Sequence, residues 1–360
     1  MRLVDRAAFP RDKLCGDSVN PGTMALLARH GLAAGVESAG LPMRGMLLTG
    51  PRGAVEGWYP SGLVGRSLVR RDLDQQLLEH AIAAGARFDA GVRVTAPVVS
   101  GTGPDRRVIG VGVAGGTARE LRARLVIAAD GRRSTLAFGL GLARHPATPR
   151  RWALGAYYAG VSGLGARGEM HVRRHGYLGI APVPGGLANV CLVVPESRAH
   201  AAVRAAPVAL EAAVLADELI RERFRSAGRV TPVTILGPLA VEASDAGLPG
   251  LLLAGDAAGF VDPMTGDGLR FAVRGGELAA DAALDALQDG VTFDRAHVNL
   301  AARRRAEFGS KRAVNRALRA LVGVPAGVSC AAVAGRLVPS VFERLIAYAG
   351  DVALAAPMRP

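Results

Sequence analysis

Aromatic residues are scarce in this sequence, and lysine is almost absent. Phe, Trp and Tyr make up 4% of the 360 residues, and lysine occurs only at Lys13 and Lys311. Surfaces that bind single-stranded nucleic acid stack the bases on aromatic side chains. The net charge of +13 is carried by scattered arginines, so it does not predict a nucleic-acid partner.

Cysteine is also rare, and its three positions show no pairing. Because Cys15, Cys191 and Cys330 are far apart in the chain, neither a disulfide framework nor a zinc site is indicated, and we expect no metal. No signal peptide is visible at the N-terminus. The apolar stretch 320–335 contains Pro325 and is too short to span a bilayer. A cytoplasmic protein is therefore expected.

One stretch, 249–281, combines an apolar run with a glycine-rich turn and a helix-compatible segment. The run Leu251–Ala254 has the length of a buried parallel strand. Asp256 follows it and could accept hydrogen bonds from sugar-like hydroxyls, while Gly266 and Gly268 would let the backbone approach a flat ligand. Strand, turn and helix in this order place a cofactor at the carboxyl end of a strand.

The segment 255–269, GDAAGFVDPMTGDGL, resembles the second FAD-binding motif of flavoprotein oxidoreductases related to p-hydroxybenzoate hydroxylase. The resemblance is strongest to the geranylgeranyl reductase branch. It implies that Asp256 holds the ribityl chain and that the loop 263–269 lies against the pyrimidine edge of the flavin. The helix N-terminus would stabilise the anionic reduced flavin. The residues that the resemblance assigns to the cofactor here are Gly255, Asp256, Pro263, Gly266, Asp267, Gly268 and Leu269.

The N-terminal segment matches the same family incompletely. Arg2–Asp5 is similar to the end of a strand whose acidic residue, Asp5, would bind the adenosine ribose. However, no G-x-G-x-x-G occurs in the first 40 residues. Loss of the central first strand would expose the edges of both neighbouring strands. We therefore expect either that Met1 is an internal residue of a longer protein or that the chain is an FAD-free descendant of the fold.

Phe9–Asp17, FPRDKLCGD, resembles the P-x-x-x-x-C-G-G stretch of geranylgeranyl reductases, with Asp17 in place of the last glycine. In that family the cysteine lies close to the flavin and the substrate. Cys15 is therefore a candidate catalytic residue. The alternative is that Cys15 is a buried small hydrophobe.

Two further motifs are assigned to the cofactor by resemblance. Arg71 matches an arginine that contacts the cofactor and precedes a Leu-Asp pair, and Arg70 is the less favoured match. Asp130 and Gly131 follow an apolar strand and match the D-G motif that ties a strand end to the cofactor region. A tight Asp-Gly turn is the alternative for this pair.

The region 141–245 is predicted to consist of strands and turns that bind the substrate. Tyr177 and Pro182 match the Y-x-W-x-F-P pattern of geranylgeranyl reductases and are the predicted substrate-contacting residues. Gly179 and Ala181 replace the two large aromatic residues of that pattern. This replacement would widen the cavity.

These matches predict an α/β fold with α+β elements. A Rossmann-like FAD-binding domain is expected from 1–40, 66–140 and 246–290, interleaved with an antiparallel-sheet substrate domain from 41–65 and 141–245. C-terminal helices would follow over 291–360.

The C-terminal helices carry a run of basic residues. They are expected to form a solvated surface, with a docking patch for an anionic membrane or a diphosphate substrate as the alternative. The basic residues are Arg303, Arg304, Arg305, Lys311, Arg312, Arg316 and Arg319.

We therefore expect an FAD-dependent oxidoreductase that acts on an apolar substrate, either isoprenoid-like or aromatic or polyketide. Reduction of C=C and hydroxylation through a flavin hydroperoxide would use the same site, and the segment around Cys15 favours reduction. NAD(P)H is a candidate electron donor. Arg270 is a second candidate catalytic residue, because a cation in the first turn of a helix opposes the helix dipole unless it faces an anion. The alternative is a non-catalytic lipid- or isoprenoid-binding protein without FAD.

Overall fold

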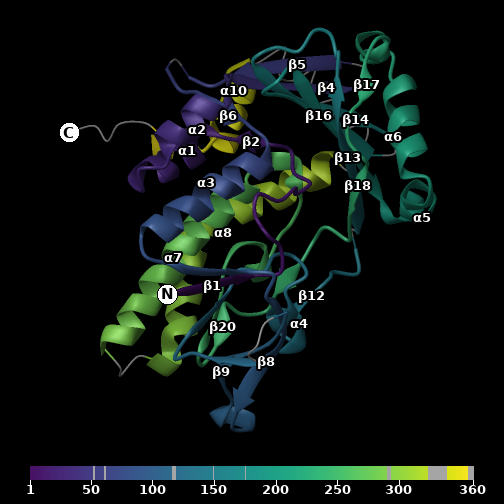
Figure 1. Cartoon of the computed structure of the whole chain (residues 1–360). Helices are drawn as coiled ribbons and strands as arrows, with labels where there is room; N and C mark the ends of the chain where they lie inside the picture. Colours follow the sequence, from purple (N-terminus) through teal and green to yellow (C-terminus); the bar gives the residue numbers. More distant parts are fainter. Residues whose placement is uncertain are drawn as a thin grey trace.

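The computed structural model shows parallel strands and long helices on one side and a large, mostly antiparallel sheet on the other (Figure 1). Cys330 and most of the stretch 320–335 lie outside the residues that it describes. Those residues are 1–51, 53–60, 62–115, 119–148, 150–174, 176–289, 293–322 and 339–355.

The parallel strands carry the segments assigned to the cofactor. β1 (Arg2–Asp5) pairs with β7 (Arg87–Ala90), and β11 (Val126–Ala128) pairs with β21 (Leu251–Leu253). β20 (Gly247–Leu248) extends the second pair in the antiparallel direction. Within the described chain, the two parallel pairs belong to separate sheets. All three residues of β21 are buried, as its continuous apolar sequence predicts.

Long helices cover these strands. α7 (Gly268–Asp289) packs along α8 (Ala296–Val322), and small residues of α7 form a core with Leu252 and Phe308. α1 (Pro21–Arg29) starts where the sequence predicts, because Asn20 Oδ1 accepts a hydrogen bond from Thr23 N at 2.8 Å. None of the described helices has the length and hydropathy that a membrane crossing requires.

Shorter elements complete this half of the molecule. A meander of three strands lies beside the parallel strands, at the bottom of Figure 1. The elements are α2 (Ala33–Ala39), α3 (Arg70–Ala83), α4 (Thr135–Gly139), α10 (Pro339–Ala349), α11 (Val352–Ala355), β2 (Ser18–Val19), β3 (Leu41–Met43), β6 (Gly65–Ser67), β8 (Arg93–Ser100), β9 (Arg107–Ala114), β10 (Glu120–Arg122), β12 (Ala143–Arg144) and β19 (Glu242–Ala243).

The large sheet has the strand order β17-β13-β16-β15-β14-β4-β5, with β18 also paired to β13. Only the β14–β4 pair is parallel. α5 (Glu196–Arg204) and α6 (Ala206–Leu215) cover one face, and the other face packs against the turn that follows β21. The strands are β4 (Gly45–Gly50), β5 (Gly53–Trp58), β13 (Arg151–Ala159), β14 (Arg167–Arg173), β15 (Gly176–Val183), β16 (Leu187–Pro195), β17 (Gly228–Arg229) and β18 (Thr234–Leu236).

The predicted fold class is confirmed. Parallel strands, an antiparallel sheet and C-terminal helices are all present, and strands from residues 45–58 join those from 151–236 in one sheet. The exact domain boundaries stay a prediction.

A charged cluster is buried between this sheet and the segment after α6. Arg223 donates two hydrogen bonds to Glu169, at 2.6 and 2.9 Å, and His171 Nε2 lies 3.0 Å from the same carboxylate. Thr49 Oγ1 is 2.9 Å from His171 Nδ1. Burial alone would raise the pKa of Glu169, but the hydrogen bonds from His171 and Arg223 outweigh burial and lower it.

Replacement of Glu169 should therefore have a pH-dependent effect. Glu169→Gln is expected to lower the free energy of unfolding by about 3 kcal/mol at pH 7, because it leaves Arg223 without its charged partner. The folded-state pKa of Glu169 is below the unfolded value of about 4.3, so its stabilisation is complete above that pH and is lost as the pH falls. Urea unfolding at pH 7 and pH 4 should show a smaller difference from wild type at pH 4.

Asp285→Asn is a matched control, because Asp285 forms an exposed pair with Arg303 at 2.6 Å. It should change the free energy of unfolding by less than about 1 kcal/mol. If Glu169→Gln lowers the free energy of unfolding equally at pH 7 and pH 4, the assigned ionised state of Glu169 is contradicted.

Candidate functional site

The turn after β21 leaves its backbone open on one side. The 3₁₀ turn Gly255–Ala258 carries Asp256, and a second one, Pro263–Thr265, ends at Gly266. Gly255 and Gly266 have φ angles of 58° and 71°, which favour glycine. A Cβ on Gly266 would meet no atom within 4 Å, and the same is true of Gly131. A flat ligand could therefore lie against this backbone.

The carboxylate of Asp256 is available to a ligand. It makes no hydrogen bond with the part of the chain that the structure describes. Burial raises the pKa of Asp256, and the charges of Lys13, Arg70 and Arg132 oppose that shift. These three cations come from separate segments, and Arg132 is held by a hydrogen bond to the carbonyl of Pro238 at 2.8 Å. The surroundings of Asp256 suit a ligand with both hydroxyl groups and negative charge.

Arg70, and not Arg71, faces this site. Its Nε and Nη2 donate to Asp74 Oδ1 at 2.9 and 2.7 Å, and Arg11 contacts Asp74 Oδ2 at 3.1 Å. Burial alone would lower the pKa of Arg70, but Cys15 and Asp74 beside its guanidinium raise it. Arg71 is exposed at the start of α3, because one residue along a helix rotates the side chain by about 100°. The structure thus places Arg70, the match that the sequence ranked second, beside Asp256.

Two other predicted cofactor residues lie at or just after the ends of parallel strands in separate sheets. Asp5, at the end of β1, accepts a hydrogen bond from Ala7 N at 2.9 Å. Asp130 is exposed and accepts from Thr135 N at 2.7 Å, at the start of α4. Cys15 is half-buried, and its carbonyl accepts from Asn189 Nδ2 at 2.6 Å.

Asp262 fastens the loop 259–268 to the large sheet. Arg151 Nη1 donates to Asp262 Oδ2 at 2.8 Å, and the Tyr177 hydroxyl donates to Asp262 Oδ1 at 2.8 Å. Burial raises the pKa of Tyr177 well above its ordinary value. In this structure the Tyr177 hydroxyl is therefore engaged with the loop. The other predicted substrate residue, Pro182, is buried, and its carbonyl accepts a hydrogen bond from Ser67 Oγ at 2.5 Å.

α8 supports the same turns from behind. Arg304 donates to the carbonyls of Ala258 at 2.7 Å and Leu253 at 3.4 Å, and Lys311 lies 3.2 Å from the carboxylate of Asp267. Arg304 is 8% exposed and Lys311 is 3% exposed. The expectation of a fully solvated basic face, or of a docking patch that uses both residues, is therefore corrected.

The spacing of residues in α8 indicates which of its polar side chains are buried, and the sequence analysis did not identify this face. The buried residues Arg304, Phe308, Lys311 and Asn315 recur at intervals of four, three and four, which places them on one helical face. Asn315 Nδ2 donates to Asp267 Oδ2 at 3.0 Å. Arg305 and Arg316 lie on the exposed side, as expected of a solvated surface.

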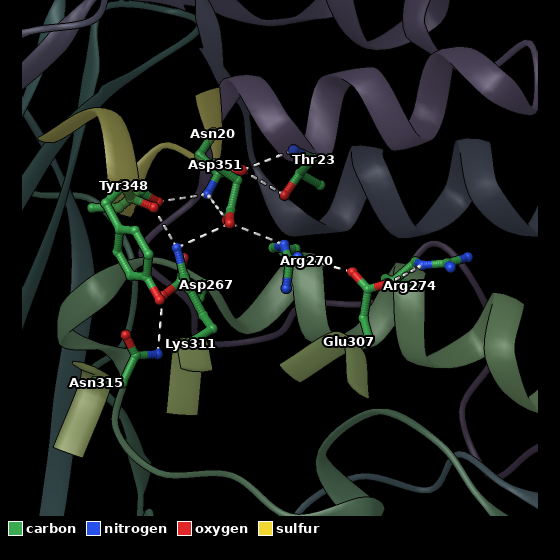
Figure 2. A network of polar contacts seen from close by, with 11 residues as sticks. Asn20, Thr23, Asp267, Arg270, Arg274, Glu307, Lys311, Asn315, Tyr348 and Asp351 are labelled. Atoms are coloured by element: carbon green, nitrogen blue, oxygen red, sulfur yellow. Dashed lines mark hydrogen bonds and ion pairs between the residues drawn. The ribbon is translucent and has the colours of Figure 1, made fainter. Parts of the chain in front are cut away.

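The C-terminal segment completes this support (Figure 2). Asp351 lies 3.0 Å from both Arg270 Nε and Lys311 Nζ, and Asn20 Nδ2 donates to it at 3.3 Å. A Cβ on Gly22 would lie 2.3 Å from Asp351 Cβ, so the close approach of α1 requires glycine at this position.

Arg270 forms its ion pairs with carboxylates of the protein itself, whereas an anionic flavin or substrate was its expected partner. Besides Asp351, it contacts Glu307 Oε1 at 3.0 Å, and its guanidinium lies over the ring of Phe308. These carboxylates account for a cation in the first turn of α7, so the argument from the helix dipole no longer needs a ligand.

The Asp256 carboxylate has no hydrogen-bond partner in the described part of the chain. This carboxylate and the open glycine turns fit the FAD that the sequence resemblance implies. The family of the FAD binding domain matches residues 1–280. This chain belongs to that family. The predicted resemblance to FAD-dependent oxidoreductases is confirmed by the curated relatives, which include reductases of two kinds.

The menaquinone reductase of Mycobacterium tuberculosis is 30% identical over 293 residues, which cover 78% of this chain and 69% of the relative. The digeranylgeranylglycerophospholipid reductase of Methanosarcina mazei is 30% identical over 236 residues, covering 64% of this chain and 55% of that protein.

Solved structures share the fold. The flavin-dependent brominase Bmp2 superposes with a TM-score of 0.82 at 18% identity, covering 97% of this chain and 86% of the brominase. A flavoprotein/dehydrogenase from Cytophaga hutchinsonii gives 0.75 at 21% identity, with 98% and 87% covered. At these identities the similarity establishes the fold alone.

Loss of the lysine that contacts Asp267 should destabilise the protein. Lys311→Met is expected to lower the free energy of unfolding by about 3 kcal/mol, because two buried carboxylates, Asp267 and Asp351, lose their shared cation. Urea unfolding measures this loss, and limited proteolysis should cleave α10 and α11 faster. Arg305→Met removes an exposed cation from the same helix and should change the free energy by less than about 0.5 kcal/mol. Equal effects of the two substitutions would show that the buried network contributes little.

Proposed function

We propose that this protein is an FAD-dependent reductase that saturates a C=C bond in an isoprenoid-like chain. The main support is Asp256, a carboxylate that has no hydrogen-bond partner within the described chain and lies among three cations beside an open glycine turn. The relatives at 30% identity are named as reductases of menaquinone and of digeranylgeranylglycerophospholipid. The halogenases among the solved structures are more distant in sequence and support the fold alone.

When bound, FAD supplies the hydride chemistry of such a reaction. Asp256 would accept hydrogen bonds from the ribityl hydroxyls, and Lys13, Arg70 and Arg132 would balance the negative charge of the cofactor. The loops that face it are already held by Arg304, Lys311 and Asp262, so binding would require little reorganisation of the protein.

The face of the large sheet that lacks α5 and α6 offers room for an apolar substrate. A Cβ on Gly179 would meet nothing closer than the carbonyl oxygen of Cys191 at 3.9 Å. A Cβ on Gly155, by contrast, would lie 2.3 Å from Leu14 Cδ1. Met170 and Leu48 also lie on this face. We place the isoprenoid-like chain over Gly179, and NAD(P)H is the proposed electron donor.

The first test is whether the purified protein binds FAD. Quenching of FAD fluorescence should show saturable binding, and Asp256→Asn should weaken it about tenfold to a hundredfold, because hydrogen bonds to a charged group contribute 1.5–3 kcal/mol each. Asp281→Asn is the control, since Asp281 is exposed on α7. A colourless preparation that cannot be reconstituted with FAD would support the alternative of a non-catalytic binding protein.

The two neighbouring arginines make a second test. Arg70→Met should weaken FAD binding about tenfold, since it removes one cation from beside Asp256. Arg71→Met should leave the affinity within a factor of two, because the side chain is exposed. The opposite ranking would restore the assignment to Arg71 that the sequence resemblance favours.

The reaction itself is distinguished by the mass of the product. Reduced holoenzyme mixed with an isoprenoid alcohol should add two hydrogen atoms to the substrate. Addition of one oxygen atom under air would show hydroxylation and overturn the proposed reductase activity.

A further inference from the structure

Asp17 occupies a conformation and an environment that suit glycine better than aspartate. Its φ angle is 52°, and only 1% of its surface is exposed. Glycine occupies the corresponding position of the family pattern that this segment resembles. A left-handed backbone and a buried carboxylate both lower the stability of the folded state. Residues held at such a cost are concentrated at functional sites.

Neutral hydrogen-bond donors surround the Asp17 carboxylate. The Tyr157 hydroxyl donates to Oδ2 at 2.7 Å, Asn189 Nδ2 donates to Oδ2 at 2.5 Å, and the amide of Arg70 donates to Oδ1 at 3.2 Å. Within the described chain no side-chain cation forms an ion pair with this carboxylate. Burial raises the pKa of Asp17 to about 6, although these hydrogen bonds oppose the shift. Both protonation states are therefore accessible near neutral pH.

Few other ionisable groups face Asp17. Cys15 precedes it in the same segment, Tyr157 belongs to β13, Cys191 belongs to β16, and Arg70 begins α3. Burial and the nearby Asp17 carboxylate raise the pKa values of both Tyr157 and Cys191, so these two groups are neutral at pH 7. Asp17 thus titrates near pH 6 while Tyr157 and Cys191 stay protonated.

Asp17 and Tyr157 lie between the proposed substrate surface and the proposed cofactor residues. Tyr157 is half-buried on the sheet face that also carries Gly179, and it pairs across the sheet with Asn189. A Cβ on Gly16 would meet no atom within 4 Å, so the side of the chain next to Asp17 is open. Arg70 links the two regions, because its amide binds Asp17 while its guanidinium faces Asp256.

We propose that Tyr157 and Asp17 form a two-residue proton donor for the reduction of the C=C bond. This proposal rests on the reductase function proposed above. One alkene carbon gains a hydride, with both electrons, from the reduced cofactor. The Tyr157 O–H bond breaks as its proton forms a C–H bond with the other carbon. When Asp17 is protonated, its hydrogen bond with Tyr157 is reversed, so that Asp17 Oδ2–H donates to the Tyr157 oxygen and the Tyr157 O–H points to the alkene. The Asp17 O–H bond then breaks as its proton moves to the Tyr157 oxygen, which leaves a carboxylate that regains a proton from water.

The test compares Asp17→Asn and Tyr157→Phe with wild type in single-turnover reduction of an isoprenoid alcohol by the pre-reduced holoenzyme. The wild-type rate should fall as the pH rises through about 6, because it requires protonated Asp17. Each variant should be slower by at least about a hundredfold, with no inflection near that pH. The double variant should be no slower than either single variant, since the two residues act as a unit.

Tyr158→Phe is the matched control. Tyr158 is the next residue of β13, faces the opposite side of the sheet, and has a buried hydroxyl with no hydrogen-bond partner among the described residues. Its replacement should leave the rate and its pH dependence unchanged.

A measurement without substrate tests the pair independently. Carbon-13 NMR of labelled aspartate should show a carboxyl that titrates near pH 6 in wild type and is absent in Asp17→Asn. Tyr157→Phe should move this titration to higher pH, because the carboxylate loses a donor. Asp17→Asn should also fold, since it replaces a buried carboxylate by a neutral group of the same shape.

The outcomes separate the two proposals. If wild type reduces the C=C bond, and Asp17→Asn and Tyr157→Phe keep its rate and pH profile, the proton donor is overturned while the reductase function stands. If wild type binds FAD but reduces no isoprenoid, the reductase function is overturned and the proton donor with it.

Discussion

The burial of two cations beneath the turns that follow β21 is the constraint on which this half of the molecule depends. Arg304 donates to the carbonyl of Leu253 at the end of β21 and to that of Ala258 in the next turn, and Lys311 lies between Asp267 and Asp351. A buried charge is tolerated only when it is paired or fully hydrogen-bonded, so the positions of these turns, of α8 and of the C-terminal segment are fixed together. The loop proposed to bind the cofactor is thus a preformed surface that is supported by α8.

The same loop is also held from the side of the large sheet. Asp262 accepts hydrogen bonds from Arg151 and Tyr177, which belong to β13 and β15. The sheet that carries the proposed substrate surface therefore sets the position of the loop that faces the proposed cofactor. Two hydrogen bonds to one carboxylate thus hold the loop against two strands of this sheet.

Much of this fold could be predicted from the sequence, because its signals are local. The apolar run 251–254, the cap at Asn20 and the glycine turns each reflect conformational preferences of a few consecutive residues. The roles of Arg270, Tyr177 and Lys311 could not be predicted in the same way. Their partners are distant in the sequence, and long polar side chains reach carboxylates that local patterns do not reveal. Arg70 and Arg71 differ only in helical phase, which depends on where α3 begins.

The contrast between the two glycines on the open sheet face has a consequence for how this protein could diverge. A Cβ on Gly155 would clash with Leu14, whereas a Cβ on Gly179 would make only an ordinary contact with the carbonyl oxygen of Cys191. A small side chain at position 179 would therefore project toward the proposed substrate region without a clash at its Cβ. Substitutions at position 179 could therefore change the length or bulk of the proposed substrate chain while the flavin chemistry stays the same.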